Sequence, residues 1–552
     1  MNTRPGQKLQ HEIIRVVHVA REYGSLAGAG GIKDVTEGLC KATAAAGIDT
    51  HIFLPYYQVI REKTQLVPKE QCRFELPMNY TQQQRTESVK IYGSSIQPNL
   101  TVHLIKAHLY DYLSEGNGLI PRKGIYQYTR EEAEALGLPE RIGKGYHDFF
   151  AMNVLLVKAT LCALGKLDLR PDVIHCHDGH AALLPLIAQA SDENWVLPFF
   201  RYVPSVITVH NAGMGYHQDI FDLEFAAAIC GVSRNVIDGC RLNGNFDPLL
   251  AGGLFGTIIN TVSENYAREL QHTGQDWMTG WLGHTLAQYG IKLVGVTNGI
   301  NPEIFDPQKP EALGLAKGFA PINGDFEGKE ICKQTLLESL GQKEIPKGIA
   351  LYGTIDYRQD IPLLTFIGRL DQQKGFDILA EAVDLLFDEE QEVQLLGLGD
   401  GDPAIRAQFT NLAEKFAGRI CVAIGYSPPL ANKIYAAGDF FLIPSRFEPC
   451  GLTDFFAQLM GNVPIVHQVG GLVKTLDGQY GLSYLGGPRE LLNVLRRALE
   501  IYREPGKATL RKIQINAVKN IHENFTWEKV LEKKYLPLYR EAMERVKPAL
   551  PY

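Results

Sequence analysis

Two cations stand close together in the segment Gly368-Arg-Leu-Asp-Gln-Gln-Lys-Gly375, directly after an apolar run that is typical of a buried strand. Gly375 opens a predicted helix, so Arg369, Lys374 and a helix N-terminus meet at the carboxyl end of one strand. This arrangement suits a diphosphate, and it would stabilise the negative charge that develops when a diphosphate leaves. Taken alone, the segment could also be a solvated basic turn.

A carboxylate follows a second predicted strand, in Ser445-Arg-Phe-Glu-Pro-Cys-Gly-Leu452. Glu448 would lie beside the start of the next helix, where the dipole favours negative charge, and it could accept hydrogen bonds from sugar hydroxyls. Alone, the motif could equally cap that helix. Together with Arg369 and Lys374 it predicts a site for a sugar joined to a diphosphate. Cys450 has no histidine or other base near it in the motif, so we expect a structural thiol.

Three histidines and an aspartate gather at the end of another predicted strand, in Asp172-Val-Ile-His-Cys-His-Asp-Gly-His180. His175 and His177 share one strand face, so zinc binding is one interpretation, but a third ligand would have to come from elsewhere. The other interpretation is a polar cluster in which Asp178 and His180 face a sugar.

Two more segments carry polar or flexible residues at strand ends. Val206-Ile-Thr-Val-His-Asn211 ends in His210, which without further context would be an ordinary buried histidine. Glu22-Tyr-Gly-Ser-Leu-Ala-Gly-Ala-Gly-Gly-Ile-Lys-Asp-Val35 is a glycine-rich turn that feeds a helix. Its small residues would let backbone amides approach a phosphate.

The elements that must position these residues fall into two runs of alternating strands and helices. In the first run we expect strands at Ile13–Ala20, Thr50–Leu54, Thr101–Ile105, Asp172–His175, Ser205–Val209, Ile258–Val262 and Leu293–Val296, with helices including Asp148–Leu164 and Ala181–Ala190. In the second we expect strands at Leu363–Ile367, Val393–Leu396, Ile420–Ile424, Phe440–Ile443 and Pro464–His467, with helices at Gly375–Phe387, Ala404–Phe416, Leu430–Ala437, Leu452–Gly461 and Arg489–Tyr502.

The pattern predicts an α/β protein with two Rossmann-like, doubly wound parallel-sheet domains that face each other across a cleft. The length of 552 residues agrees, because single cores rarely exceed roughly 250–300 residues. We assign residues 1–300 to an N-terminal domain, 301–360 to a connection around one helix, 361–524 to a C-terminal nucleotide-sugar-binding domain and 525–552 to a helical tail. Pro537 must kink or restart that tail.

The composition narrows the class of protein. A net charge of −7 gives no general attraction to nucleic acid or to anionic membranes, so we expect neither as a partner. Nine cysteines without a C-x-x-C pair predict free thiols in a reducing cytoplasm. The N-terminus has neither a long apolar segment nor a cleavage site, so no export signal or membrane span is expected. Oligomeric state is not indicated.

The motifs GRLDQQKG, IGY at 424–426, PSRFEPCGL and VGGL at 469–472 closely resemble the C-terminal domain of bacterial glycogen synthases and plant starch synthases. The segments 175–180 and 208–211 resemble the H-x-H-D-x-H and T-x-H-N stretches of the same family. The resemblance covers most of the chain. It implies a retaining glucosyltransferase with the two-lobed GT-B fold.

The resemblance also implies residue roles. Arg369 and Lys374 would hold the diphosphate of the donor, and Glu448 would orient its glucose. His210 would contact the transferred glucose and support an oxocarbenium-like centre through its backbone carbonyl, with Asp178 in the polar wall. The further substrate-binding residues would be Gly30, Gly31, His180, Asn211, Asn298, Tyr426, Cys450, Gly451, Leu452 and Thr453.

Three positions depart from the family pattern. Gly28 stands where the family usually has the donor-phosphate lysine of K-x-G-G-L, and Lys33 is a candidate substitute. Gly179 replaces a usual tryptophan, and Lys474 stands where the family commonly has aspartate. The departure at Gly28 bears most on the choice between ADP and UDP, and the one at Gly179 bears on contact with the acceptor.

The implied reaction transfers glucose, with retention, to the 4-hydroxyl of an α-1,4-glucan such as glycogen. ADP-glucose is the expected donor and UDP-glucose the alternative. No Asp-x-Asp motif precedes the segment that begins at Gly368, so we expect no metal and no cofactor. We also expect the lobes to close and exclude water. The alternatives are another GT-B transferase with a different donor or acceptor, and a catalytically decayed glucan-binding or regulatory protein.

Overall fold

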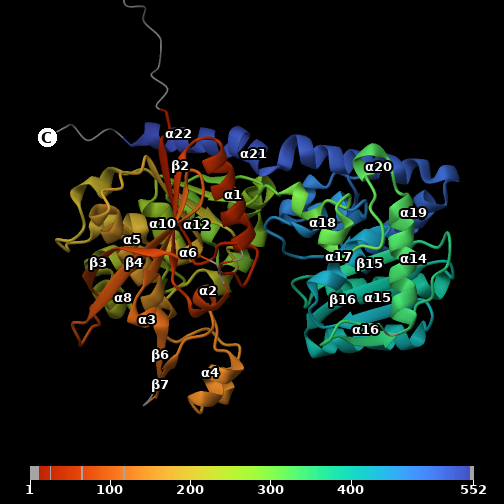
Figure 1. Ribbon diagram of the computed structural model, residues 1–552, viewed down its shortest axis with the longest axis horizontal. Coiled ribbons are helices and arrows are strands. Elements are labelled where there is room, and N and C mark those ends of the chain that lie inside the picture. Colours follow the sequence, from red (N-terminus) through yellow and green to blue (C-terminus); the bar gives the residue numbers. More distant parts are fainter. Residues whose placement is uncertain (1–11, 25, 64–65, 116–117, 343, 547–552) are drawn as a thin grey trace, which may run out of the picture. The chain divides into compact units, whose positions relative to one another are not determined.

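The computed structural model describes residues 12–24, 26–63, 66–115, 118–342 and 344–546. The chain divides into two compact units (Figure 1). Unit 1 contains Met1–Gly299 and Trp527–Tyr552, and unit 2 contains Ile300–Thr526. Each unit is built on one mainly parallel sheet with helices packed against it.

Unit 1 has a nine-stranded sheet in the order β13-β12-β9-β8-β1-β2-β5-β4-β3. Its strands are β1 Arg15–Val19, β2 Asp49–Pro55, β3 Lys69–Pro77, β4 Thr86–Gln97, β5 Leu100–Lys106, β8 Val173–His177, β9 Ser205–Val209, β12 Ile258–Thr261 and β13 Leu293–Gly295. The strands from β13 to β5 pair in parallel and match the seven predicted strands. The antiparallel β3 and β4 were not predicted, because their side chains are mostly exposed or half-buried and leave no apolar run.

The helices of unit 1 are α1 Ile32–Ala45, α2 Gln58–Lys63, α3 His108–Asp111, α4 Arg130–Ala135, α5 Phe149–Lys166, α6 Asp178–Ala181, α7 Leu184–Ala190, α8 Leu223–Cys230, α9 Arg234–Asp238, α10 Pro248–Phe255, α11 Glu264–His272 and α12 Leu282–Gln288. A small hairpin joins β6 Tyr112–Glu115 to β7 Gly118–Pro121. The helix predicted at 181–190 begins later, as α7, because α6 ends at Ala181 and Pro185 occupies the first turn of α7. The length and apolar composition of α5 would allow it to cross a membrane, but 83% of it is buried in unit 1, as in a core helix.

The C-terminal tail completes the core of unit 1 (Figure 1). It consists of α21 Trp527–Val530, a π-helical turn Leu531–Tyr535 and α22 Leu536–Arg545, so the chain restarts at Pro537 as predicted. Trp527 packs so closely on α1 that a Cβ at Gly38 would lie 1.9 Å from the indole nitrogen. Residues 527–542 therefore belong to the first hydrophobic core despite their distance in sequence.

Unit 2 has a seven-stranded sheet in the order β14-β17-β16-β15-β18-β19-β20. Its strands are β14 Ala350–Gly353, β15 Leu363–Leu370, β16 Gln394–Gly401, β17 Ile420–Ile424, β18 Phe440–Ile443, β19 Val463–His467 and β20 Leu482–Tyr484. Its helices are α13 Pro310–Leu313, α14 Glu327–Gly341, α15 Phe376–Glu389, α16 Pro403–Lys415, α17 Pro428–Ala437, α18 Thr453–Leu459, α19 Pro488–Arg503 and α20 Ala508–Asn520. Residues 301–360 lie within this unit, because α14 packs on α17 and β14 pairs antiparallel with β17.

The strand orders bring the motif-bearing loops together. In unit 1, β8 lies between β1 and β9, and in unit 2, β15 lies beside β18. Parallel neighbours end at the same edge of a sheet, where ligands of such folds usually bind. The residues that follow these strands form one candidate half-site in each unit.

Candidate functional site

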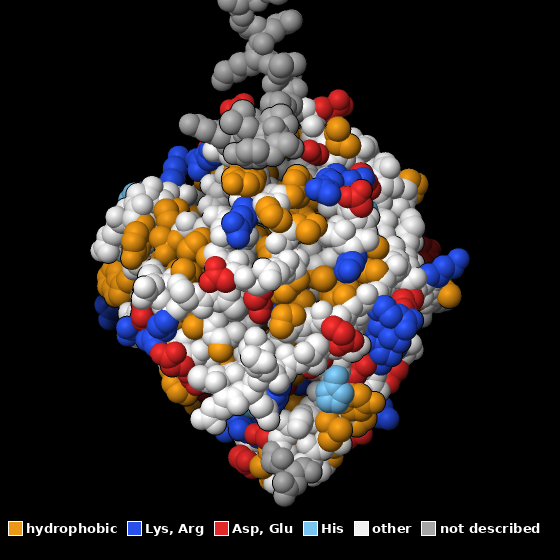
Figure 2. All heavy atoms as spheres, turned by 90° about the vertical axis from the view of Figure 1, so that its left-hand side faces the viewer, with side chains coloured by type: hydrophobic (Ala, Val, Ile, Leu, Met, Phe, Trp, Pro, Cys, Tyr) orange, Lys and Arg blue, Asp and Glu red, His pale blue; other side chains and the backbone are white. Residues whose placement is uncertain are grey.

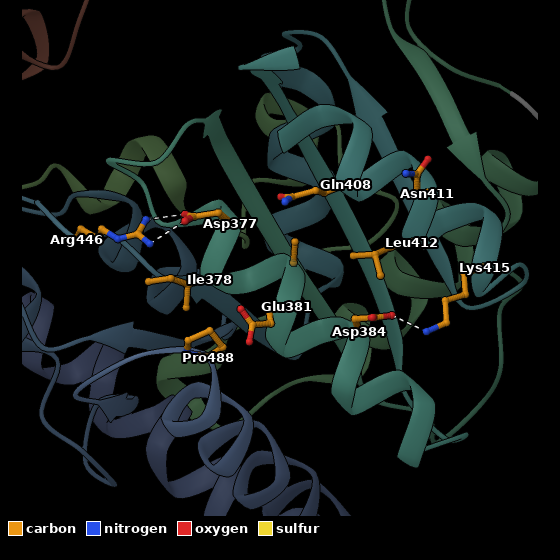
Figure 3. A pocket seen from close by; sticks show the side chains of 11 residues that line it. Asp377, Ile378, Glu381, Asp384, Gln408, Asn411, Leu412, Lys415, Arg446 and Pro488 are labelled. Atoms are coloured by element: carbon orange, nitrogen blue, oxygen red, sulfur yellow. Dashed lines mark hydrogen bonds and ion pairs between the residues drawn. The ribbon is translucent and has the colours of Figure 1, made fainter. Parts of the chain in front are cut away.

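The two motifs of unit 2 are tied to each other through backbone and side-chain bonds. Arg446 donates to the carbonyl oxygen of Gln372 at 2.6 Å and forks onto both carboxylate oxygens of Asp377 at 2.5 and 2.7 Å (Figure 3). Gly375 has a φ of +70°, and a Cβ there would lie 1.9 Å from the carbonyl oxygen of Pro444. The loop after β15 and the loop after β18 therefore form one assembly.

This assembly brings together the three charged residues that the sequence singles out in unit 2. Lys374 Nζ lies 2.6 Å from Glu448 Oε2, which also accepts a hydrogen bond from Ser445 Oγ at 3.0 Å. Arg369 pairs with Asp371, and Asp371 Oδ1 accepts the backbone N–H of Lys374 at 2.7 Å. Arg369 and Lys374 keep 57% and 31% of their side chains exposed. We call Arg369, Lys374 and Glu448 the unit 2 half-site.

The remaining predicted residues of this motif lie at the start of α18. Gly451 has a φ of +70°, Leu452 precedes the helix and Thr453 is its first residue. Cys450 is buried, and its carbonyl oxygen would be 2.0 Å from a Cβ at Gly471. The close approach of the 470–471 turn explains why that turn consists of glycines.

The buried side chain of Lys474 holds the loop at residues 450–451 to the first turn of α18. Its ammonium donates to the carbonyl oxygens of Cys450 and Gly451 at 2.7 and 2.6 Å and pairs with Asp454 at 3.0 Å. Only 8% of the Lys474 side chain and none of the Asp454 side chain is exposed. Burial raises the pKa of Asp454, and the charge of Lys474 opposes that rise. The departure at position 474 is thus matched by a buried partner of opposite charge.

Two features of unit 2 lie apart from the half-site. A pocket of about 720 Å³ on α15 and α16 is lined by Asp377, Glu381, Asp384, Gln408, Asn411 and Lys415, among others, and Arg446 is the motif residue that reaches it (Figure 3). Tyr426, predicted to bind substrate, follows β17 and is 87% exposed. None of the residues that line this pocket is a predicted site residue.

In unit 1, three imidazole rings form a row across neighbouring strands. His18 Nδ1 lies 3.2 Å from His177 Nε2, and His177 Nδ1 lies 3.0 Å from His210 Nε2. The rings stack with centroids 5.5 and 5.3 Å apart. Burial lowers the pKa of His18 and of His210 to about 3 and that of His177 well below its ordinary value. All three rings are therefore neutral near neutral pH.

The third ligand that a zinc site would need does exist, since ring nitrogens of His18, His175 and His177 lie within 4.8 Å of one another. However, both ring nitrogens of His175 are engaged, with Tyr539 Oη at 2.9 Å and Thr208 Oγ1 at 2.6 Å. Both nitrogens of His177 lie in the row. Hydrogen bonds thus engage both ring nitrogens of His175 and both of His177.

Asp178 begins α6 with a φ of +56° and places Oδ1 2.6 Å from the backbone nitrogen of His210. Burial raises the pKa of Asp178 to about 7, while the backbone N–H groups of His210 and Asn211 lower it. The carboxyl group therefore holds the His210–Asn211 backbone. His180 is buried against Tyr126, with ring centroids 5.0 Å apart. We call Asp178, His180 and His210 the unit 1 half-site.

Three neighbouring positions complete this picture. A Cβ at Gly179 would lie 2.5 Å from the carbonyl oxygen of His217, so the path of residues 217–218 explains the glycine at this position, where the family resemblance led us to expect tryptophan. Asn211 Oδ1 accepts the backbone N–H of Gly213 at 2.8 Å. Asn298 is buried, and its Oδ1 has no hydrogen-bond partner in the described part of the chain.

In the glycine-rich turn at residues 22–35, two backbone amides that were expected to approach a phosphate are already hydrogen-bonded. The backbone N–H groups of Ala29 and Gly30 donate to Glu22 Oε2 at 2.8 and 2.9 Å, so the prediction that the amides of this turn are open to a phosphate is wrong for these two. At Gly28 a Cβ would lie 2.3 Å from Cδ of Lys33. The stem of Lys33 thus fills the space in which a side chain at position 28 would begin.

Sequence reasoning missed a buried polar network around this turn. Arg21 donates to Tyr57 Oη at 2.9 Å and to Asn153 Oδ1 at 3.2 Å, while Tyr126 Oη donates to Glu22 Oε1 at 2.9 Å. Arg21 and Glu22 follow β1 after Ala20, and their position near a strand end was the available signal. Tyr57, Tyr126 and Asn153 come from separate segments without a recognisable pattern.

A second missed contact is the pair His217 and Asp247, 2.5 Å apart. Burial lowers the pKa of His217, but the hydrogen bond and charge of Asp247 outweigh burial, so its pKa is raised.

On the face of unit 1 turned to the viewer in Figure 2, acidic and basic side chains are intermingled.

Comparisons with known proteins agree with the division into two units. The family described as "Starch synthase catalytic domain" matches residues 15–284, and the family "Glycosyl transferases group 1" matches residues 361–500. A glycogen synthase of Desulforudis audaxviator is 30% identical over 552 residues, covering 97% of each chain. One of Moorella thermoacetica is 29% identical over 548 residues, covering 97% of this chain and 98% of the relative.

Among solved structures, the catalytic domain of starch synthase IV from Arabidopsis thaliana, bound to ADP and acarbose, superposes with a TM-score of 0.74. It is 23% identical, and the match covers 97% of this chain and 100% of that one. Sucrose-phosphate synthase from Thermosynechococcus elongatus gives a TM-score of 0.53 at 16% identity, with 96% and 99% covered. The match with starch synthase IV shows the GT-B fold for this chain.

Proposed function

Because this chain belongs to the glycogen and starch synthase family of glycosyltransferases, we propose that it extends an α-1,4-glucan with glucose from ADP-glucose. In the reaction, the bond between the anomeric carbon and the diphosphate breaks. A bond from that carbon to the acceptor 4-oxygen forms on the same face, and the hydroxyl proton leaves with the nucleoside diphosphate. The sugar passes through a positively charged state while the diphosphate gains negative charge.

The observation that carries this proposal is the contact between Lys374 and Glu448. It places a group suited to a diphosphate next to a group suited to sugar hydroxyls, on two loops that are bonded to each other. Arg369 adds a second, largely exposed cation. In this proposal the unit 2 half-site holds the donor and stabilises the departing diphosphate.

The unit 1 half-site has the opposite task. His210 would meet the transferred glucose, and its backbone carbonyl would face the positive charge on the sugar. Asp178 supports this role because its carboxyl group fixes the backbone on which that carbonyl lies. His180, Asn211 and Asn298 would add polar contacts to the sugars. No acidic side chain is needed as a nucleophile, so transfer proceeds without a covalent intermediate.

We assign the missing donor-phosphate cation of unit 1 to Lys33. Its stem occupies the volume left open by Gly28, and its ammonium has no ion-pair partner among the residues that the structure describes. Lys33→Ala should raise the KM for the donor roughly 10-fold, the value of one charge-assisted hydrogen bond. Moving the lysine, in Gly28→Lys with Lys33→Ala, should restore most of the affinity.

The matched control for this exchange is Lys41→Ala, on the same helix but paired with Glu37 at 2.8 Å. Its KM for the donor should stay at the parent value. A double variant no better than Lys33→Ala alone would contradict the assignment of Lys33.

The donor nucleotide is the finer part of the proposal. The starch synthase IV structure contains ADP and acarbose, a glucan-like ligand, which supports ADP-glucose over UDP-glucose. The test offers both donors in parallel, with glycogen or a short maltooligosaccharide and without added metal. Incorporation from ADP-glucose is expected, and Arg369→Ala should abolish it. Incorporation from neither donor would refute the synthase function.

A catalytically decayed binding protein is the main rival. Gly28 and Lys474 suggested it, but Lys33 fills the first gap and Asp454 compensates the second. Both departures are therefore consistent with an intact site. We further propose that the protein works in the cytoplasm, which its nine cysteines, spread along the chain without a C-x-x-C pair, support.

A further inference from the structure

The row His18–His177–His210 links the core of unit 1 to the residue proposed to meet the glucose. His18 lies on β1, His177 ends β8, and His210 follows β9, so each ring comes from a different neighbouring strand. His18 is completely buried, and His177 and His210 are 2% and 8% exposed. The row therefore runs from a dry interior towards the sheet edge that carries the half-site.

The two ring-to-ring contacts are coupled. A neutral imidazole carries one N–H and one bare nitrogen, so it donates on one side and accepts on the other. His177 makes contacts through both of its nitrogens. The two hydrogen bonds must therefore point in the same direction along the row, and the proton position on one end fixes that on the other.

The inner end of the row decides the direction. His18 Nε2 is buried and has no hydrogen-bond partner among the described residues. A buried N–H without an acceptor is rarer in proteins than a bare acceptor without a donor. We therefore take His18 Nε2 as unprotonated, which places the proton of this ring on Nδ1. His18 Nδ1–H then donates to His177 Nε2, and His177 Nδ1–H donates to His210 Nε2.

We propose that His18 is a positioning residue that, through His177, holds His210 with its proton on Nδ1. This inference rests on the proposed glucosyl transfer, because it gives His210 a hydrogen-bond donor for a sugar oxygen. Within the described part of the chain, Nδ1 of His210 has no hydrogen-bond partner, so the donor is available. If the two hydrogen bonds pointed the other way, Nδ1 of His210 would carry no proton and could only accept a hydrogen bond from the sugar.

A pair of variants at position 18 tests the function of the row. His18→Leu removes the donor, whereas His18→Asn keeps an amide N–H close to the position of Nδ1. We expect His18→Leu to lower kcat about 10-fold with little change in the KM for the donor, because only orientation is lost. His18→Asn should stay within about 3-fold of the parent.

The chain offers a matched control in a second buried pair, His51 and His103, 2.9 Å apart on β2 and β5. This pair has no hydrogen bond to the row among the described residues. His51→Leu should leave kcat unchanged. If His51→Leu and His18→Leu lower kcat equally, the effect is general loss of packing and the proposal fails.

The proton position itself can be read by nitrogen NMR on protein labelled with ¹⁵N-histidine, with His210→Gln to assign the signals. We expect a protonated Nδ1 and a bare Nε2 at His210 in the parent and in His18→Asn. A protonated Nε2 in the parent would overturn the proposal, as would one bound zinc ion per chain that His18→Leu releases. This measurement does not require activity, so it separates failure of the row from failure of the proposed transfer.

Discussion

Lys374 and Glu448 in unit 2 meet as an ion pair 2.6 Å apart, whereas His177 and His210 in unit 1 meet as two neutral rings 3.0 Å apart. The first contact joins a cationic and an acidic side chain and is partly exposed. The second is buried, and burial keeps the rings from taking up protons. The two half-sites therefore use polar residues in opposite ways.

The difference matches the two charges of the proposed reaction. A departing diphosphate is stabilised by cations, which unit 2 supplies. A sugar that becomes positive would be repelled by protonated histidines, and the buried, neutral row of unit 1 avoids that repulsion. Charge is thus placed where it helps and suppressed where it would oppose the reaction.

The largest effect is expected where the charge of unit 2 is buried. Lys474→Met leaves Asp454 without its partner and should lower the free energy of unfolding by about 3–5 kcal/mol. Lys474→Met with Asp454→Asn should recover most of this loss, measured by urea unfolding. A double variant as unstable as the single one would show that the pair is not what holds the loop.

Removal of the exposed cation tests catalysis rather than stability. Lys374→Met should lower kcat by about 10²–10³-fold, because it removes a group that stabilises the departing diphosphate. Lys415→Met is the matched control, since Lys415 is an exposed lysine of the same unit that pairs with Asp384 (Figure 3) and also with Asp388. If the two variants lose the same amount of kcat, Lys374 has no catalytic role beyond that of any exposed lysine in unit 2.

The neutral character of unit 1 gives a prediction that depends on pH. Burial raises the pKa of Asp178 to about 7 from 3.8, so the folded protein binds this proton more tightly than the unfolded chain and loses stability as the pH rises between these values. Asp178→Asn has no such proton. Relative to the parent, its stability should rise by up to roughly 4 kcal/mol between about pH 4 and about pH 7, the free energy that corresponds to this pKa shift.

Thermal unfolding of the two proteins across this pH range measures the gain. A difference that is the same at every pH would mean that Asp178 ionises normally and that this part of unit 1 is not a neutral environment.

The smallest effect is expected at the thiol of unit 2. Cys450 is buried and contributes its carbonyl oxygen to the contact with Lys474, so its sulfur is not part of the proposed chemistry. Cys450→Ala should keep kcat within about 3-fold of the parent. A loss as large as that of Lys374→Met would assign the thiol a chemical role.

Much of this arrangement could be predicted because short segments carry it. The parallel strands are continuous apolar runs, and Arg369, Lys374 and Glu448 stand within eight-residue motifs at strand ends. The resemblance to the family then supplied the roles. The edge strands β3 and β4 left no such signal because their side chains are largely solvated.

What the sequence could not provide were contacts between distant segments. Nothing local shows that Lys33 folds over Gly28, that Asp454 accompanies Lys474, or that His18 meets His177 across 159 positions. These contacts depend on strand order and burial. Two of them, at Gly28 and at Lys474, involve positions that depart from the family pattern expected from the sequence.

The return of the chain to unit 1 at Trp527 has a consequence for synthesis on the ribosome. Unit 2 is an uninterrupted segment whose ends lie together, with the backbone N–H of Ile300 donating to the carbonyl oxygen of Phe525 at 2.8 Å. Unit 1 begins first but lacks part of its core until Trp527 to Ala542 have been made. The order of completion is therefore the reverse of the order of translation: the later-made unit can finish folding while the earlier one still waits.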